Sequence, residues 1–154
     1  MKKTLLCLFV FLICSCDKFE ESNIPFARVY LELDFRFQDK DIVGVFQHKS
    51  ITKPRKAFES TGFAGVLVVC GLDPVNASTT YYAYDLCCPH ESRQNIKIIP
   101  SDDGRATCPE CKTIFDIGNG TGTPIKGVSQ YPLRRYHVLP KPGGGSQEMI
   151  VVNK

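Results

Sequence analysis

Two short segments of this sequence combine the residue types that bind soft metal ions. The first is Cys-Pro-His at positions 88–90 and the second is Cys-Pro-Glu-Cys at positions 108–111, with seventeen residues between His90 and Cys108. Together they supply three thiols and one imidazole, enough to close a tetrahedral site around a metal. Each pair follows a predicted β-strand, and neighbouring hairpins can bring two such loops together. We therefore predict a metal site formed by the following residues: Cys88, His90, Cys108 and Cys111.

Length and composition limit the class of protein. The chain has 154 residues, 43% of them hydrophobic, which suits one domain with a buried core. Nineteen Lys and Arg against sixteen Asp and Glu give a formal charge of +3, and no run of like charges is present. We therefore expect no nucleic-acid partner. No apolar stretch reaches the roughly 18 residues of a membrane-spanning helix.

The N-terminus has the pattern of an exported, lipid-anchored protein. Two lysines precede an unbroken apolar run of nine residues, Leu5 to Ile13, which is the length of a signal-peptide core. The following Ile-Cys-Ser-Cys at 13–16 resembles the lipobox of bacterial lipoproteins, in which the last cysteine is acylated and becomes the mature N-terminus. We predict a lipoprotein signal peptide over residues 1–15 and lipidation at Cys16.

This pattern also predicts the domain organisation and the location of the protein. Residues 16–23 are polar and are predicted to be a short tether, followed by a single β domain over residues 24–154. The lipid on Cys16 would hold the protein on a membrane surface, on the periplasmic or cell-surface side.

The rest of the chain predicts strands and turns. Hydrophobic and polar residues alternate over 29–37, the period of a half-buried strand, whereas 65–70 is continuously apolar, as in a central strand. Residues 49–56, with a proline inside, are predicted to form a loop. No segment keeps a helical period over ten residues, so we predict an all-β sandwich or barrel. Further strands are predicted at 42–46, 81–86, 96–99, 105–107, 113–117, 133–139 and 149–152.

The segment from residue 82 to residue 136 resembles the Rieske domain family. That family has C-x-H in one loop and C-P-x-H-G-S-x-F-D in a second loop, about seventeen residues later. The first loop matches at Cys88 and His90, and Thr113 replaces the serine of the second loop. The resemblance implies a Rieske-like β-sandwich or barrel with a small lobe that carries the ligand loops. The second loop matches at Cys108, Pro109, Phe115 and Asp116.

The second loop departs from the family at one ligand. A Rieske centre binds one iron through two cysteines and the other through two histidines, but Cys111 stands at the second histidine position here. The resemblance implies a [2Fe–2S] cluster with Cys88 and Cys108 on one iron and His90 and Cys111 on the other. Its implied role is one-electron transfer to a protein redox partner. A third thiolate lowers the potential below the usual Rieske range.

Two other interpretations of the same residues stay open. The first is a structural zinc site with three cysteines and one histidine, which leaves no open position for catalysis. The second is a site without metal, in which a disulfide joins Cys108 to Cys87, Cys88 or Cys111 in an oxidising compartment. Cys87 is also a possible alternative ligand, because it is adjacent to Cys88 and has no counterpart in the family.

The export signal and the remaining cysteine and histidine residues bear on the kind of site and on catalysis. The signal has no twin arginine, which indicates export of an unfolded chain and favours zinc or a disulfide acquired outside the cytoplasm. No Ser-His-Asp or Cys-His-Asn arrangement can be assigned, so we expect an electron-transfer or binding module rather than an enzyme. Cys70 is predicted to be an inert core thiol, and His48 and His137 to be ordinary surface or half-buried histidines.

Overall fold

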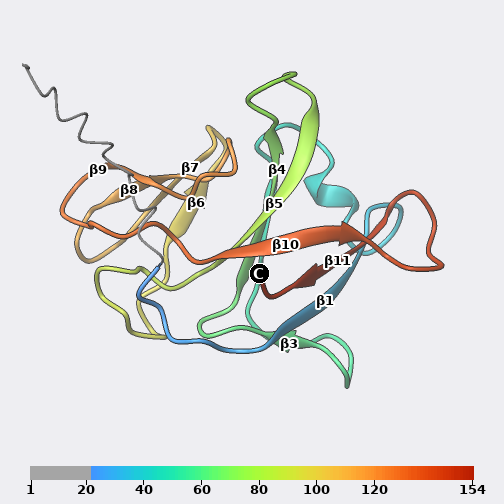
Figure 1. Ribbon diagram of the computed structural model, residues 1–154, viewed down its shortest axis with the longest axis horizontal. Coiled ribbons are helices and arrows are strands. Elements are labelled where there is room, and N and C mark those ends of the chain that lie inside the picture. Colours follow the sequence, from blue (N-terminus) through green and yellow to red (C-terminus); the bar gives the residue numbers. More distant parts are fainter. Residues whose placement is uncertain (1–21) are drawn as a thin grey trace, which may run out of the picture.

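The computed structural model describes residues 22–154 and is built from antiparallel β-strands (Figure 1). Within this range the only helix is the 3₁₀ turn η1 (Lys40–Ile42), so the predicted all-β fold class is confirmed. No helix of the described part has the length and hydrophobicity needed to cross a bilayer. The predicted signal peptide and Cys16 lie outside the described residues. The strands are β1 (Val29–Asp34), β2 (His48–Ile51), β3 (Ser60–Thr61), β4 (Val66–Leu72), β5 (Thr79–Asp85), β6 (Ile99–Ser101), β7 (Arg105–Thr107), β8 (Ile114–Asp116), β9 (Pro124–Lys126), β10 (Arg135–Pro140) and β11 (Glu148–Val152).

The strands form two sheets of unequal size. The main sheet has seven strands in the order β2-β4-β5-β10-β11-β1-β3 and curls into a nearly closed barrel. The second sheet has four strands in the order β6-β7-β8-β9 and lies beside one end of the main sheet (Figure 1). We call residues 86–133, which contain the second sheet, the ligand lobe, because both predicted ligand loops belong to it.

Strand β4 explains why its sequence is continuously apolar. Leu67 and Val69 pack in a core shared with the ligand lobe, and Val66 and Val68 pack in a second core enclosed by the main sheet. Both faces of β4 are therefore buried, so neither face needs polar residues. Like β5, whose Tyr84 and Ala83 lie in the two different cores, β4 thus joins the lobe to the main sheet.

The lobe also touches the main sheet through backbone. The Leu72 N–H donates to the Gly118 carbonyl at 2.9 Å, next to Gly71. A Cβ atom at Gly71 would lie 2.1 Å from that carbonyl oxygen, which is far inside van der Waals contact. Glycine at position 71 is therefore required by the close approach of the two sheets.

A buried carboxylate fixes the start of the ligand lobe. Asp85, the last residue of β5, is fully buried and accepts hydrogen bonds from the N–H groups of Phe63 (2.8 Å), Ala64 (3.2 Å) and Cys87 (2.8 Å). The Tyr136 hydroxyl donates a fourth bond at 2.6 Å. Burial, together with the nearby carboxylate, raises the pKa of Tyr136, so its hydroxyl remains a donor. These bonds compensate for removing the carboxylate from water.

Two local predictions are wrong for identifiable reasons. The predicted strand at 42–46 is instead the end of η1 followed by a turn, in which the Gln47 N–H donates to the Gly44 carbonyl at 2.9 Å. Only Ile42 of its hydrophobic residues is buried, and Val43 and Val45 are exposed. The predicted loop at 49–56 begins inside β2, whose polar residues form an edge strand paired with β4. Pairing with a buried neighbour outweighs the missing alternation.

Replacing Asp85 by alanine should destabilise the fold strongly. Four buried donors would lose their acceptor, so we expect the free energy of unfolding to fall by at least about 3 kcal/mol. The matched control is Asp102→Ala, an exposed carboxylate, which should change it by no more than about 0.5 kcal/mol. Urea denaturation of both variants measures the difference. Equal effects would contradict a special role for the buried carboxylate.

Candidate metal centre

The two predicted ligand loops have the same backbone turn. In the first loop the Ser92 N–H donates to the Cys88 carbonyl at 2.8 Å, and in the second the Lys112 N–H donates to the Cys108 carbonyl at 3.1 Å. Ser92 (φ 51°) and Lys112 (φ 58°) both adopt the left-handed conformation at the end of the turn. Each loop therefore folds back tightly behind its first cysteine.

The turns bring three cysteines together. The Sγ atoms of Cys88, Cys108 and Cys111 all lie within 4.8 Å of one another, and Cys88 and Cys111 are 3.7 Å apart. Sulfurs bound tetrahedrally to one zinc ion, at about 2.3 Å from it, lie about 3.8 Å apart. Cys88 and Cys108 are fully buried, and Cys111 is partly exposed. The group can hold a metal ion, and two of its three cysteines are shielded from water.

The two other predicted residues of the site lie elsewhere. His90 is exposed and does not belong to the group of mutually close ligand atoms. Its role as a ligand stays a prediction. Cys87 is fully buried, and its Sγ lies 3.4 Å from both the Cys88 and the Arg93 carbonyl oxygens. Burial raises the pKa of Cys87 to about 12, so it is a protonated structural thiol in this arrangement.

The cysteines of the described residues are all unbonded. Cys70, Cys87, Cys88, Cys108 and Cys111 are free thiols. Cys70 is buried at the end of β4, as predicted, and burial raises the pKa of its thiol. His48 is half-buried and His137 is exposed, as the sequence indicated.

The surroundings of Cys88 and Cys111 shift the pKa values of these two thiols in opposite directions. Burial raises the pKa of Cys88, and the neighbouring Cys108 raises it further, although the backbone N–H groups of Glu91 and His90 act against this. Burial also raises the pKa of Cys111, but hydrogen bonds from Thr113 and the two neighbouring thiols outweigh it, so the net pKa is lowered. Cys111 is therefore the first of these two to ionise, and a metal must displace the proton of Cys88.

Thr113 contacts Cys111, although the predicted ligand set does not include it. It is fully buried, and its Oγ1 accepts hydrogen bonds from the N–H groups of Val128 (3.1 Å) and Ser129 (3.2 Å). The same oxygen lies 3.2 Å from the Cys111 Sγ. The protonated Cys111 thiol donates to this oxygen, and once Cys111 has ionised the Thr113 hydroxyl turns its own proton to the sulfur and stabilises the thiolate. The only signal in the sequence is that Thr113 occupies the place of the Rieske-loop serine.

No protein-family model matches the chain, and no curated protein matches it significantly. Fold and site therefore define the class: an all-β protein with a small second sheet and a buried three-cysteine group that can hold a metal ion.

Replacing Thr113 by valine should raise the pKa of Cys111. The variant keeps the size of the side chain but removes the proton that stabilises the thiolate, and a hydrogen bond to a charged group is worth about one to two pKa units. The pH dependence of Cys111 alkylation, followed by peptide mass spectrometry in metal-free protein, measures it. Thr113→Ser keeps the hydroxyl and should keep the low pKa. An unchanged pKa in the valine variant would show that the hydroxyl does not act on Cys111.

Proposed function

We propose that this protein is a membrane-anchored, Rieske-like metalloprotein that transfers single electrons through a [2Fe–2S] centre. The observation that supports this most directly is the convergence of Cys88, Cys108 and Cys111 from two loops of one small lobe. Thiolates are the usual ligands of iron–sulfur clusters. The motif spacing and the separate lobe also agree with the family resemblance.

Three of the four donors of such a centre lie together, and His90 would turn inward to complete it. Cys88 and Cys108 would hold one iron, and Cys111 with His90 would hold the other. When bound, the group supplies a carrier that takes one electron from a reduced partner protein and passes it to an oxidised one. Burial keeps water away from the sulfurs of Cys88 and Cys108. The Thr113 hydroxyl would stabilise the negative charge of Cys111, and the N–H groups of the first loop would stabilise that of Cys88. Such hydrogen bonds raise the potential that the third thiolate lowers.

A single zinc ion is the second candidate. It is favoured by the 3.7 Å distance between the Cys88 and Cys111 sulfurs, which matches two ligands of one tetrahedral ion. In the cluster these two sulfurs belong to different irons and must separate. A zinc ion would join the two loops and stabilise the lobe without redox chemistry.

Metal analysis of the full chain, purified in detergent, separates the candidates. The cluster predicts about two iron and two sulfide per chain, with visible absorption that dithionite bleaches. Cys111→Ser should lose this signal, and Cys70→Ser, which removes a buried thiol outside the group, should keep it. One zinc per chain without colour would reject electron transfer and support the structural site. A chain with neither metal and with oxidised thiols would reject both.

We further propose that Cys16 carries the lipid and that the protein faces the periplasm or the cell exterior. The first described residues support this arrangement, because the chain enters the described structure beside the ligand lobe. Ile24 is buried in the same core as Cys88 and Cys108, and the Arg134 guanidinium donates to the Ile24 carbonyl. The lipid would thus hold the ligand lobe near the membrane, where a protein redox partner in or on the bilayer can reach it.

The anchor is tested by fractionation of cells that express single variants. Cys16→Ser should move the protein out of the membrane fraction and remove the acyl mass from its N-terminus. Cys14→Ser, which changes a cysteine two positions earlier, should leave the protein in the membrane fraction with its acyl mass. Membrane retention of Cys16→Ser would show that another feature anchors the chain.

A further inference from the structure

The equivalence of the two ligand loops identifies a residue that motif spacing alone does not. Both turns start at a cysteine followed by proline and end at a left-handed residue four positions later. Aligning the turns therefore pairs Cys88 with Cys108, and it pairs Glu91 with Cys111. The second loop thus provides ligand atoms from its first and fourth positions, and the fourth position of the first loop is Glu91.

Solvent exposure agrees with this alignment at the third and fourth positions, although at the second position Pro89 is buried and Pro109 is exposed. The third positions of the turns, His90 and Glu110, are both exposed. The fourth positions, Glu91 and Cys111, are both half-buried. Since Cys111 reaches the other sulfurs from the fourth position, the first loop presents Glu91 from the corresponding place and His90 from the outward one.

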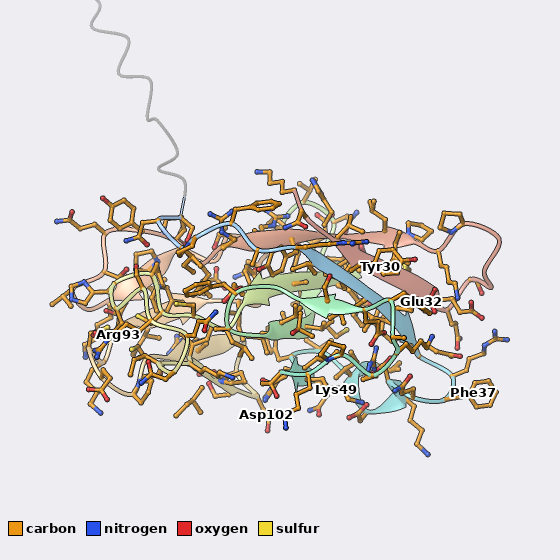
Figure 2. The ribbon with its side chains drawn as sticks, turned by 90° about the horizontal axis from the view of Figure 1, so that it is seen from below. Tyr30, Glu32, Phe37, Lys49, Arg93 and Asp102 are labelled. Atoms are coloured by element: carbon orange, nitrogen blue, oxygen red, sulfur yellow. The ribbon has the colours of Figure 1, made fainter. Side chains whose placement is uncertain are left out.

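The Glu91 side chain is oriented by a second residue. One of its carboxylate oxygens lies 2.9 Å from the Arg93 guanidinium, and the side chain is only 16% exposed. Figure 2 shows Arg93 at the end of the molecule that holds the ligand lobe, opposite to Phe37. Carboxylates that bind metals commonly use such an outer partner, which fixes one oxygen and leaves the other for the ion.

We propose that Glu91 is the fourth protein ligand when the site holds a single divalent ion, with His90 on the solvent side. Carboxylate oxygen is an ordinary zinc ligand beside thiolates. Neither the His90 ring nor the Glu91 carboxylate belongs to the group of atoms within 4.8 Å, so a side-chain rotation accompanies binding. The inference rests on the metal-binding part of the proposed function and concerns its single-ion form.

Zinc titration of the metal-free full chain against a chromophoric chelator tests this ligand. Glu91→Ala should weaken zinc binding at least about tenfold, whereas His90→Ala should stay within about threefold of the unchanged chain. Cys88→Ser sets the baseline, because it keeps the N-terminal cysteines but breaks the group. X-ray absorption of the zinc-loaded protein should show three sulfurs and one oxygen.

A gain-of-ligand pair makes the same test independent of loss of fold. Glu91→Cys should produce a site with four sulfurs, because it repeats the second loop's spacing in the first, and His90→Cys should not. Binding that is weakened by His90→Ala but not by Glu91→Ala would overturn this inference and leave the proposed metal site intact. Zinc binding by the unchanged chain no tighter than by Cys88→Ser would overturn the proposed metal site itself.

Discussion

The geometry of the site depends on one buried carboxylate. Asp85 ends β5 inside the protein and is bound by the backbone of Phe63, Ala64 and Cys87 and by the Tyr136 hydroxyl. It therefore connects β5, β10 and the loop before β4 at the point where the first ligand loop begins. Burying a charge without hydrogen-bond donors costs free energy, so the carboxylate holds these four donor groups together. Cys88 lies three residues after Asp85, so these hydrogen bonds also fix the position of its sulfur.

The second ligand loop is positioned by packing rather than by charge. Leu67 and Val69 of β4 share a core with the lobe residues Phe115 and Ile117, all of them fully buried. The lobe also meets the main sheet at Gly71, where backbone atoms approach too closely for any larger residue. Cys108 and Cys111 are thus carried on the β7–β8 hairpin, which packs against β4, the neighbour of the strand that leads into the first loop. The two loops are supported in different ways, and both bring their cysteines to one group of thiols.

Local pattern predicts a strand well where its hydrophobic side chains meet a core and poorly where pairing or packing with distant residues decides. The apolar run of β4 and the alternation of β1 both form strands, although β1 ends at Asp34 and its predicted continuation over 35–37 is a turn with Phe37 exposed. Residues 42–46 are equally apolar, yet Val43 and Val45 are exposed, because only Ile42 meets a core. In β2, by contrast, polar residues form a strand because they pair with β4. Pairing partners distant in sequence decide both cases.

The sequence by itself determined the all-β fold class and the chemistry of the site. Two loops carry three thiols in the spacing typical of ligands for soft metals. Cys88, Cys108 and Cys111 were identified because ligand type and spacing are local properties of the sequence. Only the tertiary structure decided which side chains meet. It leaves His90 exposed, turns Cys87 to carbonyl oxygens and places Thr113 against Cys111. The reason is that a side chain's direction depends on the turn that carries it and on the packing behind that turn.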